Sequence, residues 1–158
     1  MGPINPENYI LIGDTMNHLK DLVEKKIPFL HRMGLTLLEA RPCYTRLMAP
    51  MKGNENHIGT MYAGALFTLA EVPGGVIALS TFDPSRFYPV VKNLTMEFKA
   101  PVTTDAFIEI EISREEAERI LKEADENGKA DFELNAEIKN AEGAVVALSR
   151  GLYQIRKI

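Results

Sequence analysis

Glu71 is the residue with the clearest capacity for chemistry in this chain. It is the only charged residue between Ile58 and Phe82, and its neighbours there are mostly apolar or small. A carboxylate in such surroundings is costly to ionise unless another group holds it. Catalytic acids and bases are often produced in this way. Glu71 is therefore the first candidate for a general base or nucleophile.

The apolar stretch around Glu71 predicts the element that must position it. Its length would permit a membrane span, which needs about 20 mostly apolar residues. The central Glu71, Pro73 and several glycines weaken that interpretation, and the sequence contains no second span to shelter the carboxylate. The stretch instead predicts a buried helix from about Thr60 to Ser80, preceded by a polar loop from Pro50 to Gly59.

The composition is that of one globular domain. The chain has 158 residues, 46% of them hydrophobic, and a net charge of −4. This length is sufficient to form a hydrophobic core. The negative net charge does not indicate a protein that binds nucleic acid. The short apolar patch from Tyr9 to Ile12 is soon followed by Asp14 and Asp21 and has no cleavage signal, so we expect no secretory peptide and a cytoplasmic protein. The single cysteine, Cys43, excludes an internal disulfide, argues against a metal cluster and favours a small buried hydrophobe over a nucleophile.

The other elements predict an α+β fold. A helix is expected over 14–27, capped by Asp14 and ended by Pro28, within a helical extension over 1–30. Two short strands, broken near Pro42, are expected between Leu35 and Ala49. Alternation with a period of two predicts half-buried antiparallel strands, which lie at 93–99, 108–112 and 131–139, and a last strand follows at 145–155.

A charged segment separates two of these strands. It runs from Arg114 to Glu126 and is followed by Gly128, which predicts an exposed helix inserted at 114–127. We interpret residues 1–158 as a single domain in which an antiparallel curved sheet wraps around one long central helix.

The predicted central helix has two contrasting faces. Larger residues form the face expected to pack on the sheet: Leu66, Leu69, Pro73 and Ile77. The second face carries Glu71 among small residues: Gly64, Thr68, Gly75 and Ala78. Small residues permit the close approach of another backbone, so a partner subunit is the preferred interpretation, with packing inside the chain as the alternative. Open sheet edges also favour a homodimer, possibly a dimer of dimers.

The run from Asn56 to Glu71 resembles the motif of the hotdog-fold acyl-CoA thioesterases. Their pattern is an Asn, a Gly-Thr or similar pair, a His-Gly-Gly, and an acidic residue some eight positions after the first of those two glycines. Asn56, Gly59-Thr60, Gly64 and Glu71 match in register, and the order of elements matches over roughly residues 30 to 156. The resemblance implies a hotdog fold, an acyl-CoA substrate and an active site shared between subunits.

Two positions depart from this motif. Tyr62 stands in place of the family's His and Ala63 in place of its first Gly, as in a thioesterase-like branch of that family. The family uses the backbone N–H of that glycine to polarise the thioester carbonyl, and Ala63 keeps its N–H. The resemblance therefore implies catalytic roles for Glu71, Asn56 and Ala63.

The matched residues suit thioester hydrolysis. Ionised Glu71 could act as a general base on water or attack the carbonyl itself. Asn56 could position the water or the thioester, although a turn role in its loop is an equal alternative. Free N–H groups at the helix start, from Thr60 to Gly64, would face developing negative charge. We expect no metal or cofactor, and the residues expected to contact substrate are His57, Gly59, Thr60, Tyr62, Gly64 and Thr68.

Two other functions stay open. Hotdog-fold hydroxyacyl dehydratases use a His and an acidic residue across a dimer, and His57 with Glu71 could form such a pair. The changes at Tyr62 and Ala63 also leave an acyl-CoA-binding protein without catalysis. Candidates for CoA contacts follow from position only, with plain solvated charge the preferred interpretation of each: Arg86, Lys92 and Lys99.

Overall fold

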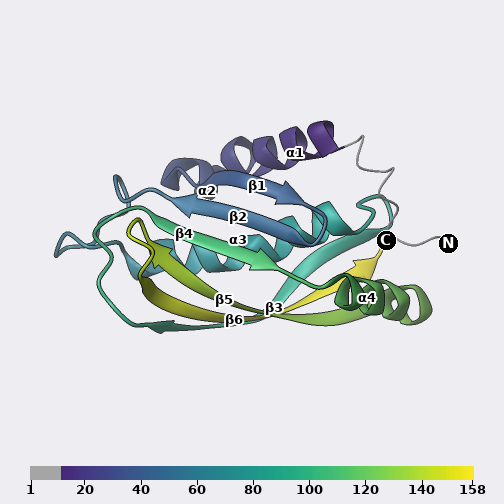
Figure 1. Ribbon diagram of the computed structural model, residues 1–158. Helices are drawn as coiled ribbons and strands as arrows, with labels where there is room; N and C mark the ends of the chain where they lie inside the picture. Colours follow the sequence, from purple (N-terminus) through teal and green to yellow (C-terminus); the bar gives the residue numbers. More distant parts are fainter. Residues whose placement is uncertain (1–11) are drawn as a thin grey trace.

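The framework of the molecule is a six-stranded antiparallel sheet curved around one long helix (Figure 1). The computed structural model describes residues 12–158. The strand order is β1-β2-β4-β5-β6-β3. The strands are β1 (Thr36–Arg41), β2 (Tyr44–Ala49), β3 (Phe87–Phe98), β4 (Ala106–Glu111), β5 (Lys129–Asn140) and β6 (Val145–Lys157), and the central helix is α3 (Ala63–Thr81). This arrangement confirms the predicted α+β hotdog fold.

The core lies between α3 and the concave face of the sheet. The four larger residues expected to face the sheet are all buried: Leu66, Leu69, Pro73 and Ile77. By length and composition α3 could cross a membrane, but 56% of its most apolar window is buried inside the fold. It is therefore the core helix of the domain and not a membrane span.

The start of α3 differs from the prediction, because the helix begins at Ala63 and not at Thr60. The preceding backbone N–H groups are held by other partners. Thr60 N donates to Asn56 Oδ1 at 3.0 Å, and Met61 N donates to the Val102 carbonyl at 2.8 Å. Tyr62 has extended backbone angles and is the N-cap. The loop is thus fixed by its own hydrogen bonds before the helix begins.

The N-terminal segment is also more divided than predicted. It forms α1 (Ile12–Asp21), a π-helical turn η2 (Leu22–Lys26) and a short helix α2 (Pro28–Met33). Asp14 lies inside α1, so the prediction that it caps a helix over 14–27 was wrong. Pro28 separates the two helical stretches and opens the second, where its missing N–H and fixed φ are tolerated. The first part of the expected extension, residues 1–11, lies outside the described residues.

The strands are confirmed in number and order, but their limits differ. β3 begins at Phe87, well before the predicted 93, because a bulge between Val91 and Asn93 breaks the alternation on which the prediction depended. The alternation predicted for 93–99 places Phe98 on the same face as Leu94 and Met96, but Phe98 is 51% exposed. The β1–β2 break lies between Arg41 and Tyr44, as predicted near Pro42.

The charged segment between β4 and β5 is the helix α4 (Arg114–Asn127), which lies at one end of the sheet (Figure 1). The Ser113 hydroxyl caps it by accepting the Glu116 N–H at 3.0 Å. Gly128 ends it in the left-handed conformation, with φ of 79°. Its buried side chains are few and small or aliphatic: Ala117, Ile120 and Ala124.

Candidate active site

Asn56 organises the loop in front of α3. Its Oδ1 accepts the N–H groups of Ile58 and Thr60, each at 3.0 Å, and its Nδ2 donates to Thr60 Oγ1 at 2.8 Å. Gly59 completes the turn with φ of 83°. The amide therefore acts as a turn residue here, which was one of the two roles expected for it. Thr60 takes part through the same hydrogen bonds.

The N-terminus of α3 offers two free donors, fewer than expected. Neither Ala63 N nor Gly64 N has an acceptor among residues 12–158, whereas Ala65 N and Leu66 N both bond to the Tyr62 carbonyl. The expectation of free donors from Thr60 to Gly64 was therefore too wide. Two adjacent N–H groups at a helix N-terminus can still stabilise an oxyanion.

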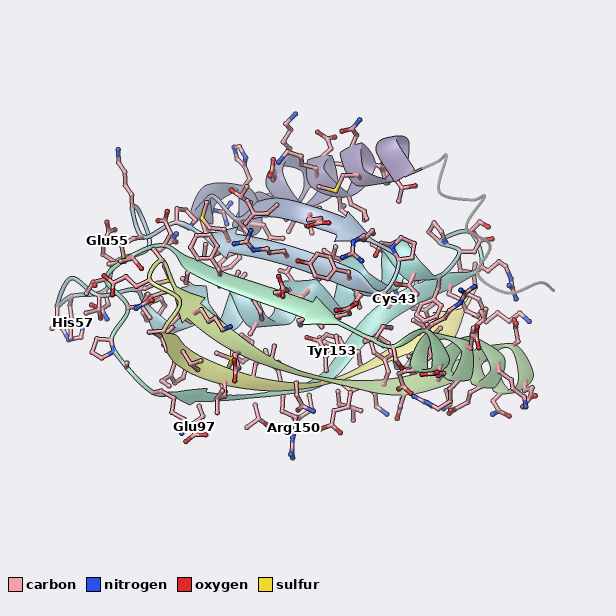
Figure 2. The ribbon with its side chains drawn as sticks, in the orientation of Figure 1. Cys43, Glu55, His57, Glu97, Arg150 and Tyr153 are labelled. Atoms are coloured by element: carbon pink, nitrogen blue, oxygen red, sulfur yellow. The ribbon has the colours of Figure 1, made fainter. Side chains whose placement is uncertain are left out.

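Tyr62 lies over this helix start. A Cβ built on Gly64 would stand 2.6 Å from Tyr62 Cε1, so the missing side chain of Gly64 makes room for the ring. Tyr62 as a residue is 61% exposed. The residue in place of the family's His thus lies beside one of the two free donors. His57, by contrast, projects from the tip of the preceding loop and is exposed (Figure 2).

Glu71 lies further along α3 and is half-buried. Burial raises the pKa of its carboxyl above the ordinary value. Among the side chains of residues 15–158, none forms a hydrogen bond or ion pair with this carboxyl. The Tyr153 hydroxyl lies below and donates to the backbone carbonyl of Glu71 at 3.1 Å, not to its side chain. An unpartnered, partly desolvated carboxylate is a strong proton acceptor once it ionises.

The carboxyl of Glu71 opens into a groove between α3 and the N-terminal helices, which we call the helix groove. Its volume is about 450 Å³. Glu71 and Thr68 are its only polar side chains among the described residues, and the Thr68 hydroxyl is occupied by the Gly64 carbonyl at 2.8 Å. The helix groove is lined by Leu22, Val23, Ile27, Phe29, Leu30, Phe67, Thr68, Glu71, Val72, Gly75, Val76 and Leu79.

A second, smaller hollow lies at the start of α3. Its volume is about 330 Å³, and it is lined by residues of the loop, of the helix start and of the segment after β3: Asn56, Met61, Ala63, Leu66, Phe98, Lys99, Ala100, Pro101 and Val102. Glu71 does not line this hollow, and Asn56 and Ala63 do not line the helix groove. Ala63 and Glu71 are eight positions apart in the helix, which is about 12 Å along its axis. One chain alone therefore does not bring the carboxylate and the donors onto one carbonyl group.

The three candidate CoA contacts differ in their surroundings. Arg86 pairs with Asp125 of α4, and Lys92 pairs with Asp131 at 2.9 Å. Lys99 pairs with Glu97 at 2.7 Å and also lines the hollow at the helix start. Only Lys99 is thus placed near the free N–H groups.

Cys43 takes no part in either hollow. It lies in the β1–β2 turn with φ of 68°, and burial raises the pKa of its thiol. A raised thiol pKa lowers the fraction of reactive thiolate. Cys43 is half-buried and not fully buried as expected, but the raised pKa of its thiol still favours a structural residue over a nucleophile.

Residues 15–153 match the family described as Domain of unknown function (DUF4442). The chain belongs to the DUF4442 family. No curated protein matches this DUF4442 protein.

Solved structures agree with the hotdog assignment. A Pseudomonas aeruginosa protein, PA5026, described as of unknown function and a probable thioesterase, shares 45% identity with this DUF4442 protein at a TM-score of 0.86, covering 90% of this chain and 96% of that one. OLEI01261 of Chlorobaculum tepidum, of unknown function, shares 25% identity at a TM-score of 0.80, with 90% and 94% covered. Thioesterase HI1161 of Haemophilus influenzae shares the fold, at 12% identity and a TM-score of 0.68, with 89% and 90% covered. This DUF4442 protein is therefore a hotdog-fold, thioesterase-like protein.

Sequence reasoning missed the contribution of the N-terminal helices to the site. Ile27, Phe29 and Leu30 line the helix groove, although they lie more than thirty residues before Glu71. The sequence itself shows only that two apolar residues, Ile27 and Phe29, flank Pro28. The small-residue face of α3, expected to meet a partner subunit, borders these helices of its own chain at Thr68 and Gly75. A Cβ at Gly75 would meet no atom within 4 Å, so packing inside the chain does not explain the small residue there, and the partner subunit stays a prediction.

Proposed function

We propose that this protein hydrolyses an acyl thioester, with acyl-CoA as the expected substrate and Glu71 as general base or nucleophile. The observation that carries the proposal is the half-buried carboxyl of Glu71, which has no partner among the described side chains and opens into an apolar groove. Such a group destabilises the folded chain, and residues that do so are characteristic of functional sites. The similarity to PA5026, a probable thioesterase, supports the same function.

The chemistry follows from the groups present. Ionised Glu71 takes a proton from a water molecule, whose oxygen bonds to the thioester carbonyl carbon. The carbonyl π electrons move to the oxygen, where backbone N–H groups at the helix start stabilise the negative charge. When the tetrahedral intermediate collapses, the C–S bond breaks and the thiolate leaves with the proton returned by Glu71. Direct attack by the Glu71 carboxylate on the carbonyl carbon would break the C–S bond, expel the thiolate and give an acyl anhydride, which water then hydrolyses to the free acid and Glu71.

Two subunits would complete this site. Glu71 and the Ala63 N–H line different hollows of one chain, so we assign the donors to the partner subunit's Ala63 and Gly64. The outer edge of β3 supports such a partner, since β3 is the last strand of the sheet and carries exposed Tyr88, Val91 and Phe98. Long, apolar edge strands are rarely left unpaired. A homodimer is the minimal assembly, and a dimer of dimers is compatible with it.

The dehydratase alternative has less support. It needs His57 and Glu71 on one substrate, yet His57 is exposed at a loop tip and lines neither hollow (Figure 2). Binding without catalysis has one observation in its favour, because the Tyr62 ring lies against Gly64 beside the free donors.

The deciding experiment is a panel of acyl-CoA thioesters assayed for release of free thiol. Glu71→Gln should abolish most turnover, whereas Glu133→Gln, which changes an exposed glutamate paired with Arg150, should leave it unchanged. Saturable binding of acyl-CoA with no thiol released by the wild-type protein would replace the proposal with the binder. Loss of water from a β-hydroxyacyl thioester would replace it with the dehydratase.

A further inference from the structure

The two adjacent glycines of α3 differ in what their missing side chains allow. A Cβ at Gly74 would overlap the ring of Tyr153, so packing requires glycine there. A Cβ at Gly75 would meet no atom within 4 Å, and its φ lies outside the left-handed region. Neither packing nor backbone conformation in the described structure therefore requires glycine at 75. Glycine inside a helix costs about 1 kcal/mol relative to alanine, so position 75 is occupied by glycine at the expense of stability.

Gly75 lies one helical turn after Glu71 and lines the helix groove with it. Residues four apart on a helix are neighbours on one face. The open space at Gly75 is therefore continuous with the space in front of the carboxyl. The opposite wall is apolar and comes from the N-terminal helices, where Phe29 is 56% exposed and Ile27 is 40% exposed.

We infer that the helix groove holds the hydrocarbon chain of the thioester, and that the absence of a side chain at Gly75 sets how long a chain it accepts. This inference rests on the proposed function only in its choice of ligand. The occupant is an unsubstituted aliphatic chain, because Thr68 already donates its hydroxyl to Gly64 and no other neutral polar side chain among the described residues lines the groove. A hydroxyl or carboxyl group on the acyl chain would be buried in the groove without a hydrogen-bond partner, which costs binding free energy.

In this arrangement the thioester carbon and its acyl chain follow one another along α3. The thioester carbonyl lies at Glu71, and the chain runs past Gly75 towards Leu79, between α3 and the pair Ile27 and Phe29. The N-terminal helices thus form the wall of the groove that selects the acyl chain. A second copy of the chain is the competing occupant, since small helical residues also admit another backbone.

The test uses non-hydrolysable S-alkyl-CoA thioethers with butyl, octyl and dodecyl chains, titrated by calorimetry against the full-length protein. Each additional buried methylene should tighten binding by about fourfold until the groove is filled. Gly75→Leu should weaken the octyl and dodecyl ligands by about tenfold or more and leave the butyl ligand nearly unchanged. Gly75→Ala should show a smaller effect of the same sign. Phe29→Ala, on the opposite wall, should flatten the dependence on chain length.

Val145→Ala is the matched control, because Val145 is an exposed aliphatic residue that does not line the helix groove. An unchanged ratio of dodecyl to butyl affinity in both Gly75→Leu and Phe29→Ala would overturn the inference. A wild-type protein whose affinity does not depend on chain length would also overturn it. If Gly75→Leu lowers the mass measured by light scattering without changing that ratio, Gly75 serves a subunit contact instead. Because binding is measured without turnover, these outcomes are independent of whether Glu71 catalyses hydrolysis.

Discussion

The ring of Tyr153 occupies the space that a side chain at Gly74 would fill. Tyr153 stands on β6 inside the curve of the sheet (Figure 2), stacks on Phe132 with ring centroids 5.6 Å apart, and is almost fully buried. Its hydroxyl donates to the carbonyls of Ala70 and Glu71, at 3.4 and 3.1 Å. The contact fixes α3 against the sheet directly beneath the candidate catalytic residue.

This contact makes the two neighbouring glycines respond oppositely to the same substitution. Gly74→Ala should lower the free energy of unfolding by about 1–3 kcal/mol, because the methyl group overlaps a buried ring that is stacked on Phe132. Gly75→Ala should raise it by up to about 1 kcal/mol, because the methyl group enters open space and the helix gains propensity. Urea unfolding of both variants measures the difference. Equal effects at the two positions would contradict the packing described for Tyr153.

Tyr153→Phe isolates the hydroxyl from the ring. The variant keeps the stacking on Phe132 and loses only the donor to Ala70 and Glu71, so we expect a loss of about 0.5–1.5 kcal/mol of stability. Thiol release from acyl-CoA should change little, because the hydroxyl contacts the backbone and not the carboxyl of Glu71. A large fall in turnover with an unchanged melting temperature would show that Tyr153 acts in the reaction.

Glu71→Gln should separate catalysis from folding. Turnover should fall by about 10²- to 10⁴-fold, the usual cost of losing a general base. The pKa of Glu71 is raised in the folded state, so its ionisation opposes folding once the pH exceeds the value of an unfolded glutamate, about 4.3. The variant should therefore match the wild-type melting temperature at acid pH and equal or exceed it at neutral pH. A lower melting temperature at neutral pH would point to a structural partner for the carboxylate.

The same pKa predicts the acid limb of the activity profile. A general base must be ionised, so kcat/KM should fall as the pH drops through the raised pKa of Glu71, above the range of an ordinary glutamate. The measurement is thiol release across pH on a substrate below its KM. An acid limb at an ordinary glutamate pKa would disagree with the burial of this carboxyl.

Substitutions of Asn56 test the loop. Asn56→Ala removes the acceptor for Ile58 N and Thr60 N, so it should lower both the melting temperature and turnover, with a smaller loss of turnover than Glu71→Gln. Asn56→Asp keeps that acceptor and should retain most of the activity. If Asp behaves like Ala while both proteins stay equally stable, the amide contacts the substrate and is not merely a turn residue.

If two subunits share the active site, turnover should depend on the formation of the dimer. Val91 is exposed on the edge strand β3, and Val91→Lys would place a charge where a second subunit would pack. We expect a lower mass by light scattering and a parallel loss of turnover. Val145→Lys, at an exposed position on β6, is the control and should change neither. Full activity in a protein shown to be monomeric would rule out the shared site.

The elements of this fold could be predicted from sequence wherever one local pattern decided them. The apolar run around Glu71 and the alternation in β5 gave the central helix and a strand because each pattern reports directly on burial. The start of α3 could not be predicted, since it depends on Thr60 and Met61 bonding to Asn56 and Val102. The first half of β3 was missed because its bulge breaks the period of two.

The residues of the candidate site could likewise be predicted from sequence only in part. Glu71 could be found because a lone charge in an apolar helix is visible in the sequence. The role of Asn56 in its loop depends on hydrogen bonds that only the folded backbone shows. The same is true of the finding that only Ala63 and Gly64 keep free N–H groups. The wall formed by Ile27 and Phe29 required knowing where the N-terminal helices pack. Contacts between distant segments leave no periodic signal in either segment.

The strand order also determines how this chain must fold. β2 pairs with β4, so that Tyr44 donates to Glu109 across 65 residues, and α3 is made in the interval between them. Pairing two such strands closes a long loop, and the entropy cost of closure comes before the contacts that stabilise the pair. This order slows folding to milliseconds or longer. The neighbouring strands β5 and β6 form a local hairpin that can assemble first. We therefore expect refolding experiments to show β5–β6 amides protected early, and β2–β4 amides only after α3 has been enclosed.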